Sequence, residues 1–195
     1  WGLYADKEKV AVSILVCTEA GDKNSGNYTV QQTVGNIAAN RKDCIALAQV
    51  DGTSSTTTNY NTILSNAGYD FNNPSYVALY AGWDKIYDRF NDREIFIPKC
   101  IYGASLMART DTVANVWNAP AGVNRGRISS LAQNVVFNDT QIGLLRDNNI
   151  NISKFIRGQG GNFMWSQKTA LRKSSALSDI NVRRLLIYLE TTIES

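Results

Sequence analysis

Strand-like and helix-like patterns alternate over the first 80 residues, and this alternation restricts the chain to few folds. Residues 9–19 (KVAVSILVCTE) and 44–50 (CIALAQV) are apolar runs of strand length. Residues 28–40 carry apolar side chains at helical spacing, and residues 57–67 suit a second helix. Residues 76–80 begin a third strand. This order predicts an α/β fold in which βαβ units form a mainly parallel or mixed sheet with flanking helices.

The rest of the chain predicts a smaller α+β segment. Residues 150–156 and 162–166 flank a glycine-rich turn, which favours a hairpin, and residues 180–194 suit an amphipathic helix. We therefore expect an α/β core domain over residues 1–149 and the start of a second domain over residues 150–195. Between these parts we expect a strand at 93–97, helices at 98–108 and 139–146, a loop at 117–126 and an extended segment at 128–137.

The expected final helix has one apolar face. Its apolar residues recur at i, i+3, i+4, i+7 and i+11, the spacing that gathers side chains on one stripe. They are Val182, Leu185, Leu186, Leu189 and Ile193. Arg183 and Arg184 fall outside the stripe. We therefore expect both arginines to face outward.

The chain contains no histidine, and this removes several classes of chemistry. It excludes Ser-His-Asp and Cys-His catalysis and any histidine-ligated metal. Cys17, Cys44 and Cys100 are an odd number without C-x-x-C spacing, so neither a disulfide framework nor a zinc site is expected. No phosphate-binding glycine motif and no Ser-x-x-Lys spacing occurs. We expect no enzyme activity, cofactor or metal.

Two further groups of residues have the composition of possible sites. Residues 51–58 follow a strand and precede a helix, the position at which open α/β sheets bind small ligands, although a turn with a Ser/Thr helix cap is favoured there. A set of acidic residues alternates with basic ones, which favours surface ion pairing over a metal site or a carboxylate pair. The acids are Asp84, Asp88, Asp92 and Glu94, and the bases are Lys85, Arg89 and Arg93.

The charge is uneven along the chain. The net charge is +3, and residues 101–195 hold 11 Lys/Arg against 6 Asp/Glu. A basic half of this kind suits either a solvated face, a nucleic-acid surface or an acidic protein partner. The longest apolar stretch, residues 10–17, is far shorter than the roughly 20 residues of a membrane helix.

Five ordered segments carry a family resemblance. They are SYVALYAGWDKIYDRFNDREIFIP (75–98), GASLMARTD (103–111), VWNAPAGVNRG (116–126), NNINISKFIRGQGGNFMWSQKTAL (148–171) and INVRRLLIYLETTI (180–193). At this order and spacing they resemble the tail sheath proteins of contractile-tailed bacteriophages, most of all the T-even-like branch. The resemblance covers most of the chain from Ser75 onward. One departure is Gly82 before Trp83, where many members have proline.

The resemblance implies a structural subunit with no catalytic residue and no cofactor. Its partners would be other sheath subunits in hexameric rings, the tail tube and the baseplate, with no membrane and no direct nucleic-acid contact. The sleeve would contract to drive the tube through the host envelope. The protein would belong to the virion tail and assemble in the host cytoplasm. The sheath of a phage-tail-like bacteriocin or secretion machine is the alternative.

In related sheaths the region of the final helix lines the inner wall and meets the tube. By this resemblance Lys173, Arg183 and Arg184 are the candidate contacts with an acidic tube or a neighbouring subunit. The chain starts at Trp1 and stops at Ser195, where a strand-adding arm would follow, so we expect an internal fragment of a longer chain. Alone, it is expected to be monomeric.

Overall fold

The core of the molecule is a parallel four-stranded sheet. The structure is a computed structural model, and it describes residues 1–23, 26–50 and 60–194. The strands lie in the order β1-β2-β3-β8, and every neighbouring pair is parallel. Their bounds are β1 Ile14–Ala20, β2 Ile45–Gln49, β3 Val77–Tyr80 and β8 Ile150–Asn151. This sheet with its flanking helices confirms the α/β fold predicted from the alternating patterns.

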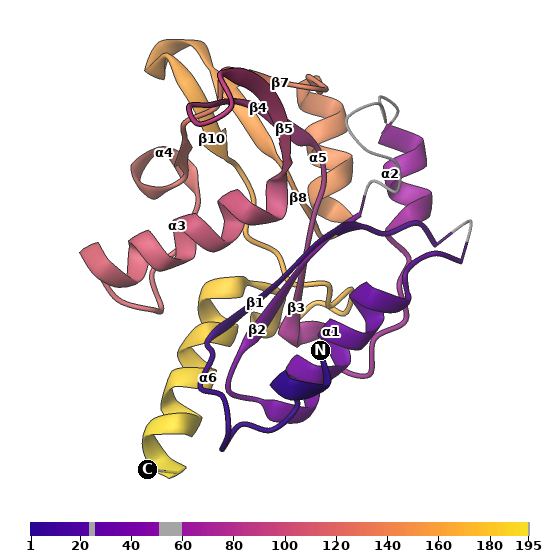
Figure 1. Cartoon of the computed structure of the whole chain (residues 1–195), viewed down its shortest axis with the longest axis vertical. Helices are drawn as coiled ribbons and strands as arrows, with labels where there is room; N and C mark the ends of the chain where they lie inside the picture. Colours follow the sequence, from indigo (N-terminus) through magenta and orange to yellow (C-terminus); the bar gives the residue numbers. More distant parts are fainter. Residues whose placement is uncertain (24–25, 51–59, 195) are drawn as a thin grey trace.

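Helices α1 (Thr29–Arg41) and α3 (Lys99–Val113) cover opposite faces of this sheet (Figure 1). A methyl group added at Gly35 of α1 would lie 2.9 Å from the Val77 side chain, and one added at Gly103 of α3 would lie 2.5 Å from the Tyr80 ring. Val77 and Tyr80 are three positions apart on β3, so they point to opposite sides of the strand. The glycines let both helices approach the sheet closely.

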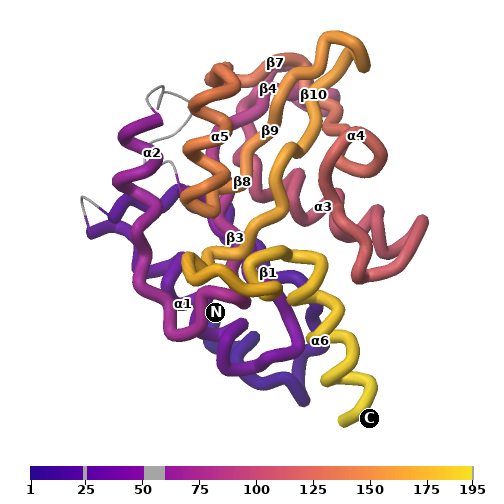
Figure 2. Tube along the Cα trace, turned by 180° about the vertical axis from the view of Figure 1, so that it is seen from behind, coloured from indigo at the N-terminus to yellow at the C-terminus, as the bar shows by residue number. Residues whose placement is uncertain are grey.

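Two small antiparallel sheets sit beyond the carboxyl end of the core (Figures 1 and 2). One has the order β5-β4-β7 and the other β6-β10-β9. Their strands are β4 Trp83–Asp88, β5 Arg93–Pro98, β6 Arg127–Ile128, β7 Ala132–Gln133, β9 Ser153–Ile156 and β10 Gly161–Met164. The expected hairpin is present as β9 and β10, but Ile150–Asn151 lies instead in the core sheet. Strand β4 was not expected.

The remaining helices follow their local signals. Asn138 accepts a hydrogen bond from the Gln141 backbone N–H, and the Gln141 side chain accepts one from the Asn138 backbone N–H, a capping box that starts α5 (Asp139–Asp147). The final helix α6 spans Ile180–Glu194, as expected. Helix α2 spans Tyr60–Asn66, and a short α4, Gly122–Arg125, lies within the expected loop. Strand β8 begins at residue 150 and pairs with β3, so residues from both expected domains, 1–149 and 150–195, contribute to the core sheet. The boundary between these two domains stays a prediction.

A buried ion pair fastens the small sheets to the core. Lys99 Nζ donates hydrogen bonds to Asp84 Oδ1 at 2.6 Å and to Ser153 Oγ at 2.7 Å. Gln133 Nε2 donates to the same Ser153 oxygen at 2.5 Å. Asp84 is fully buried, so the expectation that it pairs on the surface is wrong. Burial raises the pKa of Asp84, and Lys99 opposes that rise.

The three cysteines behave as small core residues. All are buried and free of disulfides. Burial raises the pKa of the Cys17 thiol to about 11 and that of Cys44 to about 12. The Cys100 Sγ donates to the Cys17 carbonyl oxygen at 3.5 Å, across the contact between α3 and β1. Each thiol is therefore packed as a small apolar side chain.

Candidate interface at the C-terminal helix

The buried face of α6 is not the face that the apolar stripe predicts. Its buried residues are Ile180, Arg183, Arg184 and Ile187, at i, i+3, i+4 and i+7. Arg183 is 4% and Arg184 6% exposed. The expectation that the two arginines face outward is therefore wrong. The helix has the predicted length but is rotated about its axis, so that its arginines meet the core.

Arg183 is held by the turn that precedes β3. Its Nη2 donates to the Ser75 hydroxyl at 2.6 Å, and its Cζ lies 4.2 Å from the centroid of the Tyr76 ring. A planar guanidinium can stack on an aromatic face and still donate at its edge, which an ammonium cannot do. Burial raises the pKa of Tyr76, and the positive charge of Arg183 opposes this rise. The contact fixes the first turn of α6.

Arg184 joins α6 to helix α3. Its Nη2 lies 2.5 Å from Asp111 Oδ2 near the C-terminus of α3. The Arg183 Nε, the Arg184 Nη1 and the Asp111 Oδ1 are buried atoms without a hydrogen-bond partner. Buried polar atoms of this kind cost free energy. The docking of α6 is consequently polar at its two arginines, where the hydrogen bonding is incomplete, and apolar at Ile180 and Ile187.

The apolar stripe of α6 is left largely at the surface of its C-terminal half. Leu189 is 43% and Ile193 84% exposed, and the Tyr188 ring packs at 5.7 Å against the ring of Trp117. A hollow of about 620 Å³ lies between this helix and residues 7–13. In Figure 1 the C-terminal half of α6 projects from the lower edge of the molecule. An apolar face exposed on a projecting helix suits a protein partner.

Lys173 occupies a different environment from the two arginines. It lies in the loop before the 3-10 turn Ala176–Ser178, its side chain is exposed, and its carbonyl oxygen accepts from the Ser178 hydroxyl at 3.0 Å. Because Arg183 and Arg184 are buried, the three residues do not form one basic surface. The periodicity of the sequence does not identify Ser75, Tyr76 and Asp111 as partners of the two arginines. These residues are recognised only from their contacts with α6 in the folded chain.

The structure adds no support for a small-ligand site or a metal site within the described residues. The candidate ligand site at residues 51–58 lies outside the described residues. In the described ranges, no group of three or more His, Cys, Asp or Glu side chains is placed to hold a metal ion. None of the helices in those ranges is both long and apolar enough to cross a membrane.

Comparison with curated proteins finds tail sheath proteins. No protein-family model matches the chain. It is 31% identical over 209 residues to the tail sheath protein of Enterobacteria phage T4, covering 99% of this chain and 31% of that protein. It is 28% identical over 216 residues to the tail sheath protein of Vibrio phage KVP40, covering 98% of this chain and 31% of that protein. The chain thus spans under a third of these relatives' length. The predicted resemblance is confirmed.

Solved structures share the fold. The anti-feeding prophage helical sheath in its contracted state aligns with a TM-score of 0.64 at 20% identity, covering 98% of this chain and 49% of that chain. The sheath complex of an extracellular contractile injection system, PVC, also contracted, aligns with a TM-score of 0.61 at 21% identity, covering 95% of this chain and 48% of that one. At these identities the likeness establishes a common fold.

Proposed function

We propose that this chain is part of the subunit of a contractile tail sheath. Copies of the subunit would form hexameric rings stacked around a tail tube, and the sleeve would shorten when the baseplate triggers it, driving the tube through the host envelope. The subunit would be assembled in the bacterial cytoplasm and remain in the virion tail. The proposal assigns the chain no catalytic residue and no cofactor, and it expects the isolated chain to be monomeric.

One observation carries the proposal: sequence similarity to tail sheath proteins of two phages extends over nearly the whole chain. The shared fold with two contracted sheaths supports it. A further match is to an anti-feeding prophage baseplate described with six-fold symmetry, at a TM-score of 0.64 and 21% identity. The exposed apolar face on α6 suits a polymer subunit, because such a face gains free energy when a neighbour covers it.

Lys173 remains the proposed contact with an acidic tube or a neighbouring subunit, because its side chain is exposed while Arg183 and Arg184 are engaged within the chain. The variant Lys173→Glu should weaken binding of the protein to tail tubes in a sedimentation assay at low salt. The matched control is Lys9→Glu, another exposed lysine, whose side chain is 79% exposed. Equal binding by both variants would leave Lys173 without this role.

The sheath of a phage-tail-like bacteriocin or secretion machine is the second candidate. The solved structures with this fold include an anti-feeding prophage and an extracellular contractile injection system. Both kinds of particle use a contractile sleeve, so the chain itself would do the same work in each. The two candidates differ in whether a capsid is attached to the particle that carries the sheath.

Immunogold electron microscopy tests the proposed function on intact particles. An antibody raised against this chain should label particles from the producing cells along the length of the tail, before and after contraction is triggered. Antibody absorbed with the purified chain is the control. Label confined to capsids, to the bared tube or to unassembled protein would contradict the proposal. Capsids on the labelled particles would identify a phage, and their absence an injection machine.

A further inference from the structure

Helix α6 buries little apolar surface against the rest of the chain. Beyond its first residue, Ile180, the only apolar side chain that it buries is Ile187. Each residue of the apolar stripe from Val182 to Leu189 lies two positions after a buried residue, which is about 200° around a helix. The stripe therefore points almost directly away from the buried face. Every residue from Tyr188 to Glu194 is exposed, so the second half of the helix is attached only at its sides.

Four buried polar atoms without a hydrogen-bond partner gather where α6 meets the core. They are Arg183 Nε, Arg184 Nη1, Asp111 Oδ1 and Gln167 Oε1. The Gln167 side-chain amide donates to Asn181 Oδ1, in the first turn of α6, at 2.9 Å. In water each of these atoms would be hydrated, so docking of the helix sacrifices hydration that its release restores.

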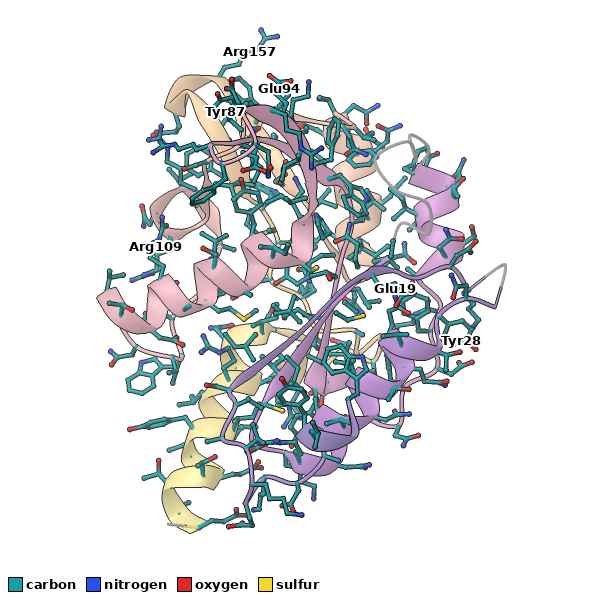
Figure 3. All side chains as sticks on the ribbon, in the orientation of Figure 1. Glu19, Tyr28, Tyr87, Glu94, Arg109 and Arg157 are labelled. Carbon is teal, nitrogen blue, oxygen red and sulfur yellow. The ribbon has the colours of Figure 1, made fainter. Side chains whose placement is uncertain are left out.

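The remaining attachments of α6 lie at the edge of the fold. Figure 3 shows Arg109 on the outer part of α3, and Asp111 follows two residues later, so Arg184 is tied to the end of α3. Near the end of α6, Lys7 Nζ lies 2.9 Å from Glu194 Oε2, but these side chains are 45% and 67% exposed. Ion pairs as exposed as this one contribute little to stability.

The segment before α6 is fastened to the core independently of the helix. The Ala170 N–H donates to the Val77 carbonyl oxygen of β3 at 2.7 Å, and the Ile180 N–H donates to the Gln167 carbonyl oxygen at 2.9 Å. The core sheet itself ends with Asn151 of β8. The helix can therefore leave from a hinge beside Ile180 without breaking any hydrogen bond of the sheet.

We infer that residues 181–194 form a latch, which undocks from the core as one unit while the core sheet, α1 and α3 stay folded. Arg183 and Arg184 hold it closed through their contacts with the Ser75–Tyr76 turn and Asp111. Such a latch lets the terminal helix change position without unfolding the core. It is a property of this chain by itself, beyond the proposed function, and it holds whether or not the chain forms a sheath.

Native-state hydrogen exchange, followed by NMR at several low urea concentrations, tests the latch. A released helix of 14 residues is marginal in water, so its amide protons exchange once it undocks. Amides 184–187 should share one opening that is at least about 100-fold more frequent than the opening of β2 amides. Fraying of the helix end would speed exchange only at 188–194. Protection at 184–187 equal to that in β2 would overturn the inference.

Two variants separate undocking from global unfolding. Asp111→Asn removes the counter-ion of Arg184 and should speed exchange at 184–187 about 30-fold. The matched control is Val34→Ala, at a fully buried position of α1. It weakens a core that is folded in both the closed and the undocked forms, so it should speed exchange of β2 amides at least about tenfold and leave 184–187 unchanged. Equal acceleration of both sets by Val34→Ala, or no acceleration at 184–187 by Asp111→Asn, would refute the latch.

Discussion

Arg184 and Asp111 form an ion pair with a 2.5 Å N–O distance, and it ties the last helix of the chain to the end of α3 across 73 residues of sequence. The Arg184 side chain is 6% exposed and that of Asp111 29%. Removing one partner of such a sheltered pair destabilises the fold, because the other partner keeps its charge in a buried position without a counter-ion.

Asp111→Asn should therefore destabilise the chain by about 2 kcal/mol, since Arg184 keeps its charge and loses its counter-ion. Urea unfolding followed by circular dichroism measures this. Asp147→Asn, at an exposed position on α5, should change the free energy of unfolding by less than about 0.5 kcal/mol. Equal effects at the two positions would show that the pair does not hold α6.

Arg183→Lys should destabilise the chain by about 1 kcal/mol although the charge is kept. The lysine ammonium cannot lie flat on the Tyr76 ring while donating to the Ser75 hydroxyl. Thermal unfolding of the variant beside the parent gives the difference. A lysine variant as stable as the parent would mean that charge alone, and not the stacked geometry, fixes the first turn of α6.

Lys99→Met should cost about 3–5 kcal/mol at neutral pH, because it leaves the Asp84 carboxylate buried without its cation. Removing Lys99 would raise the pKa of Asp84 further above its unfolded value, so the folded state would bind the extra proton. The stability of this variant should therefore increase as the pH falls from 7 towards 5. Denaturant titrations at several pH values test this, and adding Asp84→Asn should remove the pH dependence.

Two glycines on different helices should respond to alanine in opposite directions. The new methyl of Gly103→Ala would lie 2.5 Å from the Tyr80 ring, and overpacking should destabilise the chain by about 1–3 kcal/mol. Gly143→Ala on α5 meets nothing within 4 Å and should stabilise it by about 0.5–1 kcal/mol through helix propensity. Both changes are measured on one denaturant scale, and a Gly103→Ala variant as stable as the parent or more stable would refute the close approach of α3 to β3.

The buried thiols should be unreactive in the folded chain. At pH 8 Cys17 and Cys44, with pKa values of about 11 and about 12, carry almost no thiolate, whereas unfolding in urea should release all three thiols to a chromogenic disulfide reagent. Above about pH 9 the unfolded chain loses thiol protons that the folded chain retains. Stability should then fall as the pH rises further. Rapid labelling in native buffer would contradict this burial.

The core sheet was predictable because its signal is local. Residues 44–50 are apolar except for Gln49, as expected for a parallel strand that is covered on both faces. The helices between the strands show their own period. Strand β4 escaped prediction since its charged residues resemble a surface turn. Asp84 in particular is charged yet buried, and its partner Lys99 lies beyond the next strand.

The length of helix α6 was predictable from the sequence, but the face that it turns towards the core was not. Periodicity locates a stripe on α6 and assumes that the apolar side faces the core. The partners that reverse this assumption, Ser75 and Asp111, lie 108 and 73 residues away from the arginines they bind. Contacts at such separation leave no trace in the local pattern, so the sequence predicts outward-facing arginines where the structure has buried ones.

The Lys99 cluster also makes α3 the common anchor of two distant parts of the fold. Its ammonium ties the β4–β5 hairpin, through Asp84, to the first turn of α3 and, through Ser153, to β9. Near its other end, α3 is tied to the terminal helix by the ion pair between Asp111 and Arg184. One helix therefore carries a sheltered ion pair towards each of its ends, one to the small sheets and one to α6.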